Sequence, residues 1–203
     1  ANLTTIAGLT PGTSGNVLTS DGTFWTSAAA GSTAGAAQFV AATGPDGAAG
    51  TIDGDYKYHV FKASKSGATD GFYVTNVGII GTVEYMVVAG GGAGVPYHDS
   101  QGSGGAGGAG GYRAGTGQSV SAQNYPITVG NGGTAAASNA VGDNGDVSVF
   151  NGITALGGGG GGSNLSGTAT FAGAAGGSGG GGSGTGVGGS ADEGTASGGA
   201  GEY

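Results

Sequence analysis

The sequence offers few side chains that could carry out a reaction. His98, Asp99 and Ser100 supply the three residue types of a hydrolytic triad, but a triad is assembled from distant parts of a fold, and three adjacent residues cannot adopt its geometry. Residues 142–146 hold two carboxylates beside glycine, too few oxygen ligands for calcium, so a turn between strands is the preferred interpretation. The six glycines at 157–162 precede no Gly-Lys-Ser/Thr of a phosphate loop. We therefore predict no enzyme activity, no metal site and no cofactor.

Binding is the better-supported chemistry. Tyr97, His98 and Asp99 lie in a segment rich in small residues, and Tyr112 and Arg113 follow a glycine run. Rigid aromatic rings beside adaptable small residues and a planar cation are typical of recognition surfaces. In the alternative interpretation, Tyr97 and Tyr112 wedge between glycine layers while Arg113 neutralises a nearby carboxylate. The residue types alone favour neither interpretation over the other.

Composition argues against several classes of partner. The 203 residues include 55 Gly and no Cys, with 12 acidic and four basic residues and a net charge of −8. Arg113 is the only Lys or Arg after Lys65, so no basic patch can neutralise nucleic-acid phosphates. No apolar run approaches the roughly 20 residues that span a bilayer. We expect neither nucleic-acid binding nor membrane insertion.

Three zones differ in composition. We expect a leader at residues 1–50 that attaches the protein to a particle, a β-rich body at 51–156 with a glycine-rich insertion at 90–117, and a glycine-rich region at 157–203. Alternation and β-branched content predict strands at residues 56–62, 72–77, 83–89, 125–129, 146–150 and 153–156. Asn151-Gly152 between the last two is a type I′ turn signal. No helical periodicity stands out, so we predict an all-β fold with a small β-sandwich-like body and very little α-helix.

The leader contains a hairpin signal. Ser-Asp-Gly at residues 20–22 separates two short β-prone runs within residues 15–27. A lone hairpin is marginally stable in water, so Leu18, Phe24 and Trp25 would need cover from another subunit or domain. The alternative is a partly ordered linker in which Trp25 packs locally.

The glycine is arranged with a period of three. Within residues 102–112 the non-glycine residues are Ser103, Ala106, Ala109 and Tyr112. A polyproline II-type helix has three residues per turn and no internal hydrogen bonds, so these four side chains would share one edge. Several such polyglycine II helices could hydrogen-bond to one another because glycine permits close approach. The alternative is a flexible Gly/Ser linker, which the period and the interrupting hydrophobic residues disfavour.

Four sequence blocks carry a family resemblance. They are Gly-Thr-Val-Glu-Tyr-Met-Val-Val-Ala-Gly-Gly-Gly-Ala from residue 81, Gly-Gly-Ala-Gly-Gly-Tyr-Arg-Ala-Gly from 107, Tyr-Pro-Ile-Thr-Val-Gly-Asn-Gly-Gly from 125 and Ser-Val-Phe-Asn-Gly-Ile-Thr-Ala-Leu before the six glycines from 148. In this order, over about residues 56–190, they resemble the glycine-rich domain of tailed-bacteriophage tail-fibre proteins. The leader at residues 15–28 resembles the short hairpin of phage fibre stalks.

The resemblance implies a virion fibre that attaches to the host cell surface. It implies a homotrimer, with the leader residues Leu18, Phe24 and Trp25 in particle attachment and trimer contacts. Other virion proteins and a host surface glycan or outer-membrane protein would be the partners, and Tyr97, His98, Asp99, Tyr112 and Arg113 the receptor contacts.

Two other functions share most of these features. A purely structural virion protein, such as a head fibre or capsid decoration, would lack only the receptor contacts. An ice-binding protein could also use stacked glycine helices, but it should present a regular Thr/Ala face, and the Thr residues here are scattered.

Overall fold

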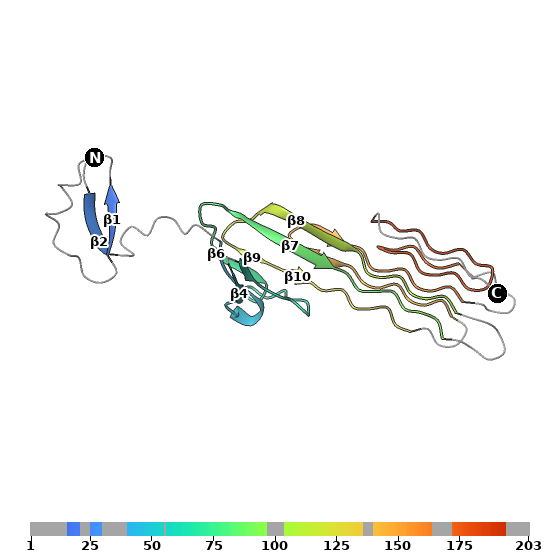
Figure 1. The fold of residues 1–203 in the computed structure, drawn as a ribbon. Coiled ribbons are helices and arrows are strands. Elements are labelled where there is room, and N and C mark those ends of the chain that lie inside the picture. The colour runs from blue at the N-terminus through green and yellow to red at the C-terminus, as the bar shows by residue number, and fades with distance from the viewer. Residues whose placement is uncertain are drawn as a thin grey trace.

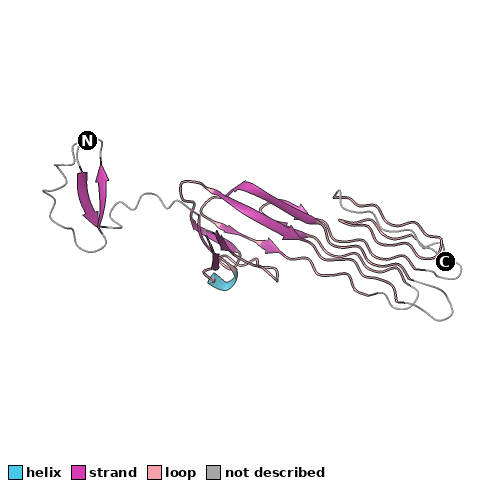
Figure 2. Cartoon of the chain, in the orientation of Figure 1, coloured by secondary structure: helices cyan, strands magenta, loops and turns pink. Residues whose placement is uncertain are grey.

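The chain folds into β-strands and extended glycine-rich segments. The computed structural model describes residues 40–54, 56–96, 104–135, 140–163 and 172–193, together with two leader strands. These residues contain no α-helix, and one 3-10 turn, η2 (Pro45–Gly47), is their only regular helix. Within them, no helical segment has the length and apolar character to traverse a bilayer. The predicted all-β class is confirmed (Figure 2).

The leader hairpin is present in the backbone. Strands β1 (Asn16–Ser20) and β2 (Trp25–Ala29) pair antiparallel, with Ser20 opposite Trp25. Leu18 and Trp25 therefore lie on the hairpin, whereas Phe24 lies outside the described residues. The cover that we predicted for these side chains stays a prediction.

The body consists of small antiparallel sheets. One sheet has the order β3-β6-β9, another β10-β11-β12, and β4-β5 and β7-β8 are two-stranded. The bounds are β3 (Ala41–Thr43), β4 (Thr51–Asp53), β5 (Tyr56–Tyr58), β6 (Phe72–Asn76), β7 (Thr82–Val88), β8 (Tyr112–Ser119), β9 (Asn124–Tyr125), β10 (Ile127–Thr128), β11 (Ser148–Phe150) and β12 (Ile153–Ala155).

Phe150 joins the two side-chain cores of the body. One core is built on Val74 and Tyr125, and the other on Val87 and Ala155; Phe150 packs against both. Its ring lies edge-on to Phe72, with ring centroids 5.8 Å apart. The sheets are therefore held together by one small aromatic and aliphatic cluster.

Most predicted strands are confirmed, with shifts that have local causes. Strands form within 72–77, 146–150 and 153–156, and β7 covers 83–88 of the run predicted at 83–89. Asn151 and Gly152 have φ values of 45° and 78°, as a type I′ turn requires. The strand expected at 56–62 was wrong beyond Tyr58, where β5 ends. The run at 125–129 is divided at Pro126, which lacks the N–H that a ladder needs. Strand β8 was missed because half of its residues are small and none is β-branched except Thr116.

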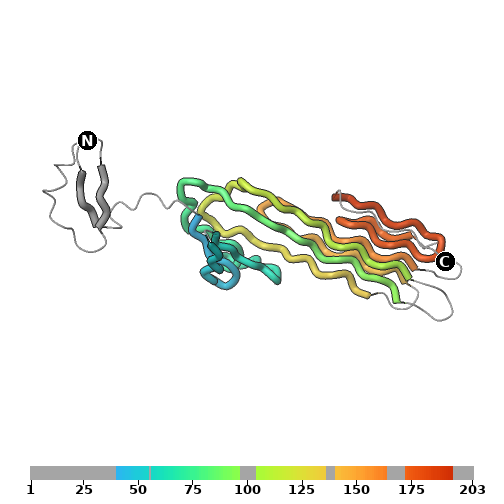
Figure 3. The backbone as a smooth tube through the Cα atoms, viewed as in Figure 1, coloured from blue at the N-terminus to red at the C-terminus, as the bar shows by residue number. Residues whose placement is uncertain are grey.

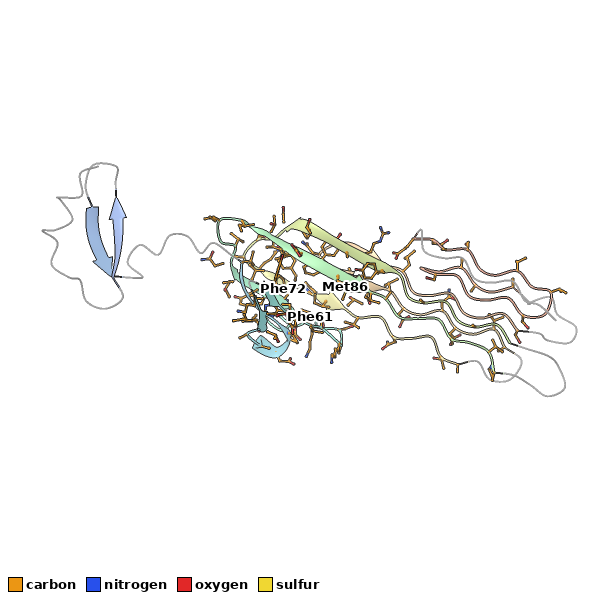
Figure 4. All side chains as sticks on the ribbon, in the orientation of Figure 1. Phe61, Phe72 and Met86 are labelled. Carbon is orange, nitrogen blue, oxygen red and sulfur yellow. The ribbon has the colours of Figure 1, made fainter. Side chains whose placement is uncertain are left out.

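Strands of the body continue directly into glycine-rich segments. β7 runs into residues 89–95, residues 104–111 run into β8, β10 into 130–134, 141–146 into β11, and β12 into 156–163. Residues 172–177, 178–183 and 186–192 lie beside them, and we call the whole set the glycine lattice. Its segments run side by side away from the strands (Figures 1 and 3). Long side chains gather over the body, where Phe61 and Phe72 lie, while the lattice carries few (Figure 4).

Main-chain hydrogen bonds between lattice segments recur every third residue. The N–H groups of Ala89, Gly92 and Val95 donate to the carbonyls of Gly111, Gly108 and Gly105, at 3.0, 2.8 and 3.0 Å. Gly111, Gly108 and Gly105 also donate their own N–H groups to the next segment. The acceptors are the carbonyls of Leu156, Gly159 and Gly162, at 2.7, 2.7 and 2.8 Å. A three-residue repeat bonded to several neighbours is the pattern of packed polyglycine II-type helices. The prediction of ordered glycine helices is confirmed, and the linker interpretation is wrong for these residues.

Residues 156–163 form the centre of the lattice. Every carbonyl from 156 to 162 accepts a backbone hydrogen bond, and the donors come from three neighbouring segments, 104–111, 141–146 and 172–177. They are Gly111, Gly177, Gly145, Gly108, Ala174, Gly142 and Gly105. Residues 157–163 are all buried. The centre of this half of the protein is thus a hydrogen-bonded main chain rather than a cluster of side chains.

Glycine is needed here for close approach. A Cβ on Gly158 would overlap the carbonyls of Gly108 and Ala109, and one on Gly161 would overlap Gly105. None of the lattice glycines from 89 to 163 has a positive φ, so their role is steric. By contrast, a Cβ on Gly91 or Gly94 would meet nothing nearer than 3.5 or 3.6 Å. The third position of each turn therefore tolerates a side chain where it faces outward.

The predicted side-chain edge agrees with this geometry. Ala106, Ala109 and Tyr112 are all exposed on one segment, at three-residue spacing. Ser103 lies outside the described residues. Residues 142–146 were predicted as a turn, and that prediction was wrong: they are an extended lattice segment, in which Gly142 and Gly145 donate to Gly161 and Gly158.

Adjacent glycines should respond oppositely to the same substitution. Gly92→Ala places a Cβ against the carbonyls of Gly158 and Gly159, so we expect a loss of about 1–3 kcal/mol in the free energy of unfolding. Gly91→Ala meets open space and reduces the freedom of the unfolded chain, so we expect no loss, or a gain of about 0.4–1 kcal/mol. Chemical denaturation of both variants measures the difference. Equal effects would contradict the lattice geometry.

His59 packs inside the body, against Phe72 and beside two glycines. Its ring lies edge-on to Phe72, with centroids 5.5 Å apart, and occupies the space that a Cβ on Gly44 or Gly50 would take. Its Nδ1 is buried and makes no hydrogen bond to a described residue. Burial, and then the charge of Lys57, lower the pKa of His59.

A lowered pKa in the folded state makes stability depend on pH. The unfolded chain binds the proton first, so stability is fully present above the ordinary histidine pKa of about 6.5 and is lost as the pH falls toward the folded value. We expect the melting temperature of the wild type to fall more between pH 7.5 and 5 than that of His59→Gln, measured in parallel. Parallel pH profiles would show that His59 does not contribute.

Candidate functional site

The described residues that flank residues 97–103, 136–139 and 164–171 all lie at one end of the lattice. There Val95 donates to Gly105, Gly105 to Gly162, and Gly162 to Gly181. The turn at 184–185 follows Ser183, whose carbonyl accepts from Gly186, at this end too. We call it the loop end; it lies away from the β-strands (Figure 1).

Three of the five predicted contact residues belong to a segment of the loop end. Tyr97, His98 and Asp99 lie outside the described residues, between Pro96 and Gly104. The described residues nearest to them in the chain that make lattice hydrogen bonds are Val95 and Gly105, which bond to each other at the loop end. The contacts predicted for Tyr97, His98 and Asp99 stay a prediction.

Tyr112 and Arg113 lie far from the loop end. They follow residues 104–111, and a polyproline II-type helix rises about 3.1 Å per residue, which separates them from Gly104 by about 25 Å. Of the five predicted contact residues, the structure places only this pair, on β8 at the strand end of the lattice.

Arg113 forms an ion pair with a buried carboxylate. Its Nε lies 3.3 Å from Oε1 of Glu193, whose side chain is 1% exposed against 51% for Arg113. The same Oε1 accepts a hydrogen bond from the N–H of Leu156 at 2.9 Å. Gly111 leaves room for this carboxylate, because a Cβ there would overlap Oε2. Arg113 thus neutralises a nearby carboxylate, as the alternative interpretation held. The ion pair lies at the strand end of the lattice, beside Leu156.

Tyr112 does not wedge between glycine layers. Its side chain is exposed, and it pairs across the sheet with Val88, which is also exposed. Arg113 pairs with the buried Val87 on the other face of β8. Tyr112 and Arg113 therefore point to opposite faces and cannot contact the same ligand together.

The described residues gather no group suited to metal binding. No three His, Cys, Asp or Glu side chains come together in these parts of the chain. The polar side chains of 142–146 serve the lattice: Asn144 Oδ1 accepts from the N–H of Gly160 at 2.8 Å, and Asp146 Oδ2 accepts from Asn131 at 3.3 Å.

The glycine pattern is shared with a known family. The sequence profile of a family described as a glycine-rich domain matches residues 69–203. The chain belongs to this family. The match covers β6 to β12 and the whole lattice, which places the glycine helices and the strands that feed them in one family domain. No curated protein and no solved structure matches the chain significantly.

Glu193 is the functional side chain that the sequence did not reveal. It stands after a long glycine-rich stretch with no local pattern around it. The sequence could predict only that Arg113 pairs with some carboxylate, because it is the only Lys or Arg after Lys65. Nothing in the sequence distinguishes Glu193 from Asp192 as that partner.

Removing Arg113 should destabilise the protein because it leaves Glu193 buried and without its cation. We expect Arg113→Ala to cost about 1–3 kcal/mol in the free energy of unfolding. Adding Glu193→Gln should recover part of this loss, because the neutral amide can still accept from Leu156. Urea denaturation of both single variants and the double variant gives the coupling. A zero coupling would mean that the ion pair contributes nothing.

Proposed function

We propose that the protein is a fibre component of a virion that attaches the particle to the host cell surface through the loop end. The observation that carries this proposal is that the described residues flanking three connections of the lattice lie at one end of it, together with the turn at 184–185. The sequence blocks that resemble phage tail-fibre proteins support the same function.

The lattice suits a display role. Its segments are held by main-chain hydrogen bonds that repeat along their length. Binding residues are commonly carried on loops that a rigid scaffold positions. Tyr97, His98 and Asp99 would then contact a surface glycan or an outer-membrane protein.

The leader would supply the other attachment. We propose that the β1–β2 hairpin, with Leu18, Phe24 and Trp25, joins other virion proteins and holds three copies together as a homotrimer. A two-stranded hairpin alone is marginally stable, which favours a role that includes a covering partner.

A purely structural virion protein is the second candidate. It is favoured by the ion pair of Arg113 with Glu193, because a cation that was a candidate receptor contact already pairs with a carboxylate of the same chain. In that case the loop end would contact other virion proteins or nothing, and the purified protein would not bind cells.

Substitution at the loop end should separate the two candidates. We expect the labelled full chain to bind host bacterial cells, and Tyr97→Ala to weaken this binding about tenfold, with an unchanged melting temperature, as loss of an aromatic anchor does. Tyr56→Ala is the matched control, because Tyr56 is exposed on β5 in the body. Absence of cell binding by the wild type would exclude attachment, and equal effects of the two variants would exclude Tyr97.

A further inference from the structure

One face of the protein combines exposed apolar side chains with bare main chain. On the paired strands β7 and β8, Val88 lies opposite Tyr112 and Met86 opposite Ala114. Met86 is 69% exposed, and Val88 and Tyr112 are 51% and 53% exposed. Met86 lies on β7, next to where this strand enters the lattice (Figure 4).

The face continues without a break along the lattice. A Cβ on Gly94 would lie 3.8 Å from the Cα of Ala106, and one on Gly91 would lie 3.5 Å from the Gly108 carbonyl. Ala106 and Ala109 are exposed beside them. We call the set the outer face: Met86, Val88, Gly91, Gly94, Ala106, Ala109, Tyr112 and Ala114.

Main-chain groups beside the outer face have no partner among the described residues. The N–H groups of Gly91 and Gly94, and both the N–H and C=O groups of Gly107 and Gly110, make no hydrogen bond to another described residue. All four residues are at least partly exposed. They recur at three-residue spacing, so the face presents donors and acceptors with the repeat of the lattice itself.

We propose that the outer face binds the same glycine-rich face of a second copy of this chain. Such a surface offers the hydrogen-bonding repeat that these groups require, and apolar side chains that would cover Met86, Val88 and Tyr112. Lattice neighbours are already both antiparallel, as residues 104–111 are to 156–163, and parallel, as 89–95 are to 156–163. A second copy can therefore join in either direction.

Charge does not oppose self-association through this face. Each copy carries a net charge of −8, so copies repel wherever carboxylates face one another. Residues 85–97 and 100–112 contain no Asp, Glu, Lys or Arg. The outer face is therefore a neutral surface on an acidic protein. This inference concerns the lattice and does not depend on receptor binding at the loop end.

Sedimentation equilibrium of the full chain over a range of micromolar concentrations tests the proposal. We expect the wild type to associate beyond the trimer proposed for the leader, and this further association to be at least about tenfold weaker in Ala109→Glu, because the new carboxylate would be buried without a partner. Val187→Glu is the matched control: Val187 is 67% exposed on lattice segment 186–192, outside the outer face, and this variant should associate as the wild type does.

If Ala109→Glu melts at a lower temperature than the wild type, Met86→Glu tests the strand part of the outer face in the same measurement. A wild type that forms nothing larger than the trimer proposed for the leader, or association beyond that trimer that survives both outer-face substitutions, would overturn the proposal. Equal losses in Ala109→Glu and Val187→Glu would also overturn it, because net charge would then explain the effect. None of these results bears on cell binding by Tyr97, which has its own control.

Discussion

The hydrogen bond between neighbouring glycine helices is the interaction on which the rest of this structure depends. Residues 157–162 have no side chains, and their main chain is surrounded by the main chains of five other segments. A Cβ on Gly158, Gly159 or Gly160 would overlap a neighbouring carbonyl. Each such bond contributes on the order of 1 kcal/mol, and ordering glycine costs a comparable amount. The lattice therefore needs the help of other parts of the protein.

That help comes from the strands and from one ion pair. β7, β8, β10, β11 and β12 continue directly into lattice segments, so sheet pairing sets the register of five segments. The small core around Phe150 fixes these sheets relative to one another. At the same end, Glu193 accepts from Leu156 and pairs with Arg113. A side-chain core of modest size can thus order a much longer stretch of glycine.

The sequence predicted the kinds of structure better than their partners. The three-residue period of Ala106, Ala109 and Tyr112 and the positive-φ pair Asn151-Gly152 are local signals, and both predicted correctly. Strand β8 was missed because its pairing with β7, rather than its own composition, makes it a strand. Residues 142–146 read as a turn because nothing local shows that Gly161 and Gly158 will accept their N–H groups. For the same reason Arg113 could be proposed as a contact, but Glu193 could not be named as its partner.

The function proposed for the loop end rests on the lattice being rigid, so its order is the property to measure. Residue-resolved amide hydrogen exchange on the full chain compares positions that the structure treats differently. The account predicts slow exchange at residues 158–162, whose N–H groups are buried and bonded, and fast exchange at the exposed Gly132, which lies outside the outer face and whose N–H group has no described partner. Exchange at residues 158–162 as fast as in an unfolded peptide would contradict it.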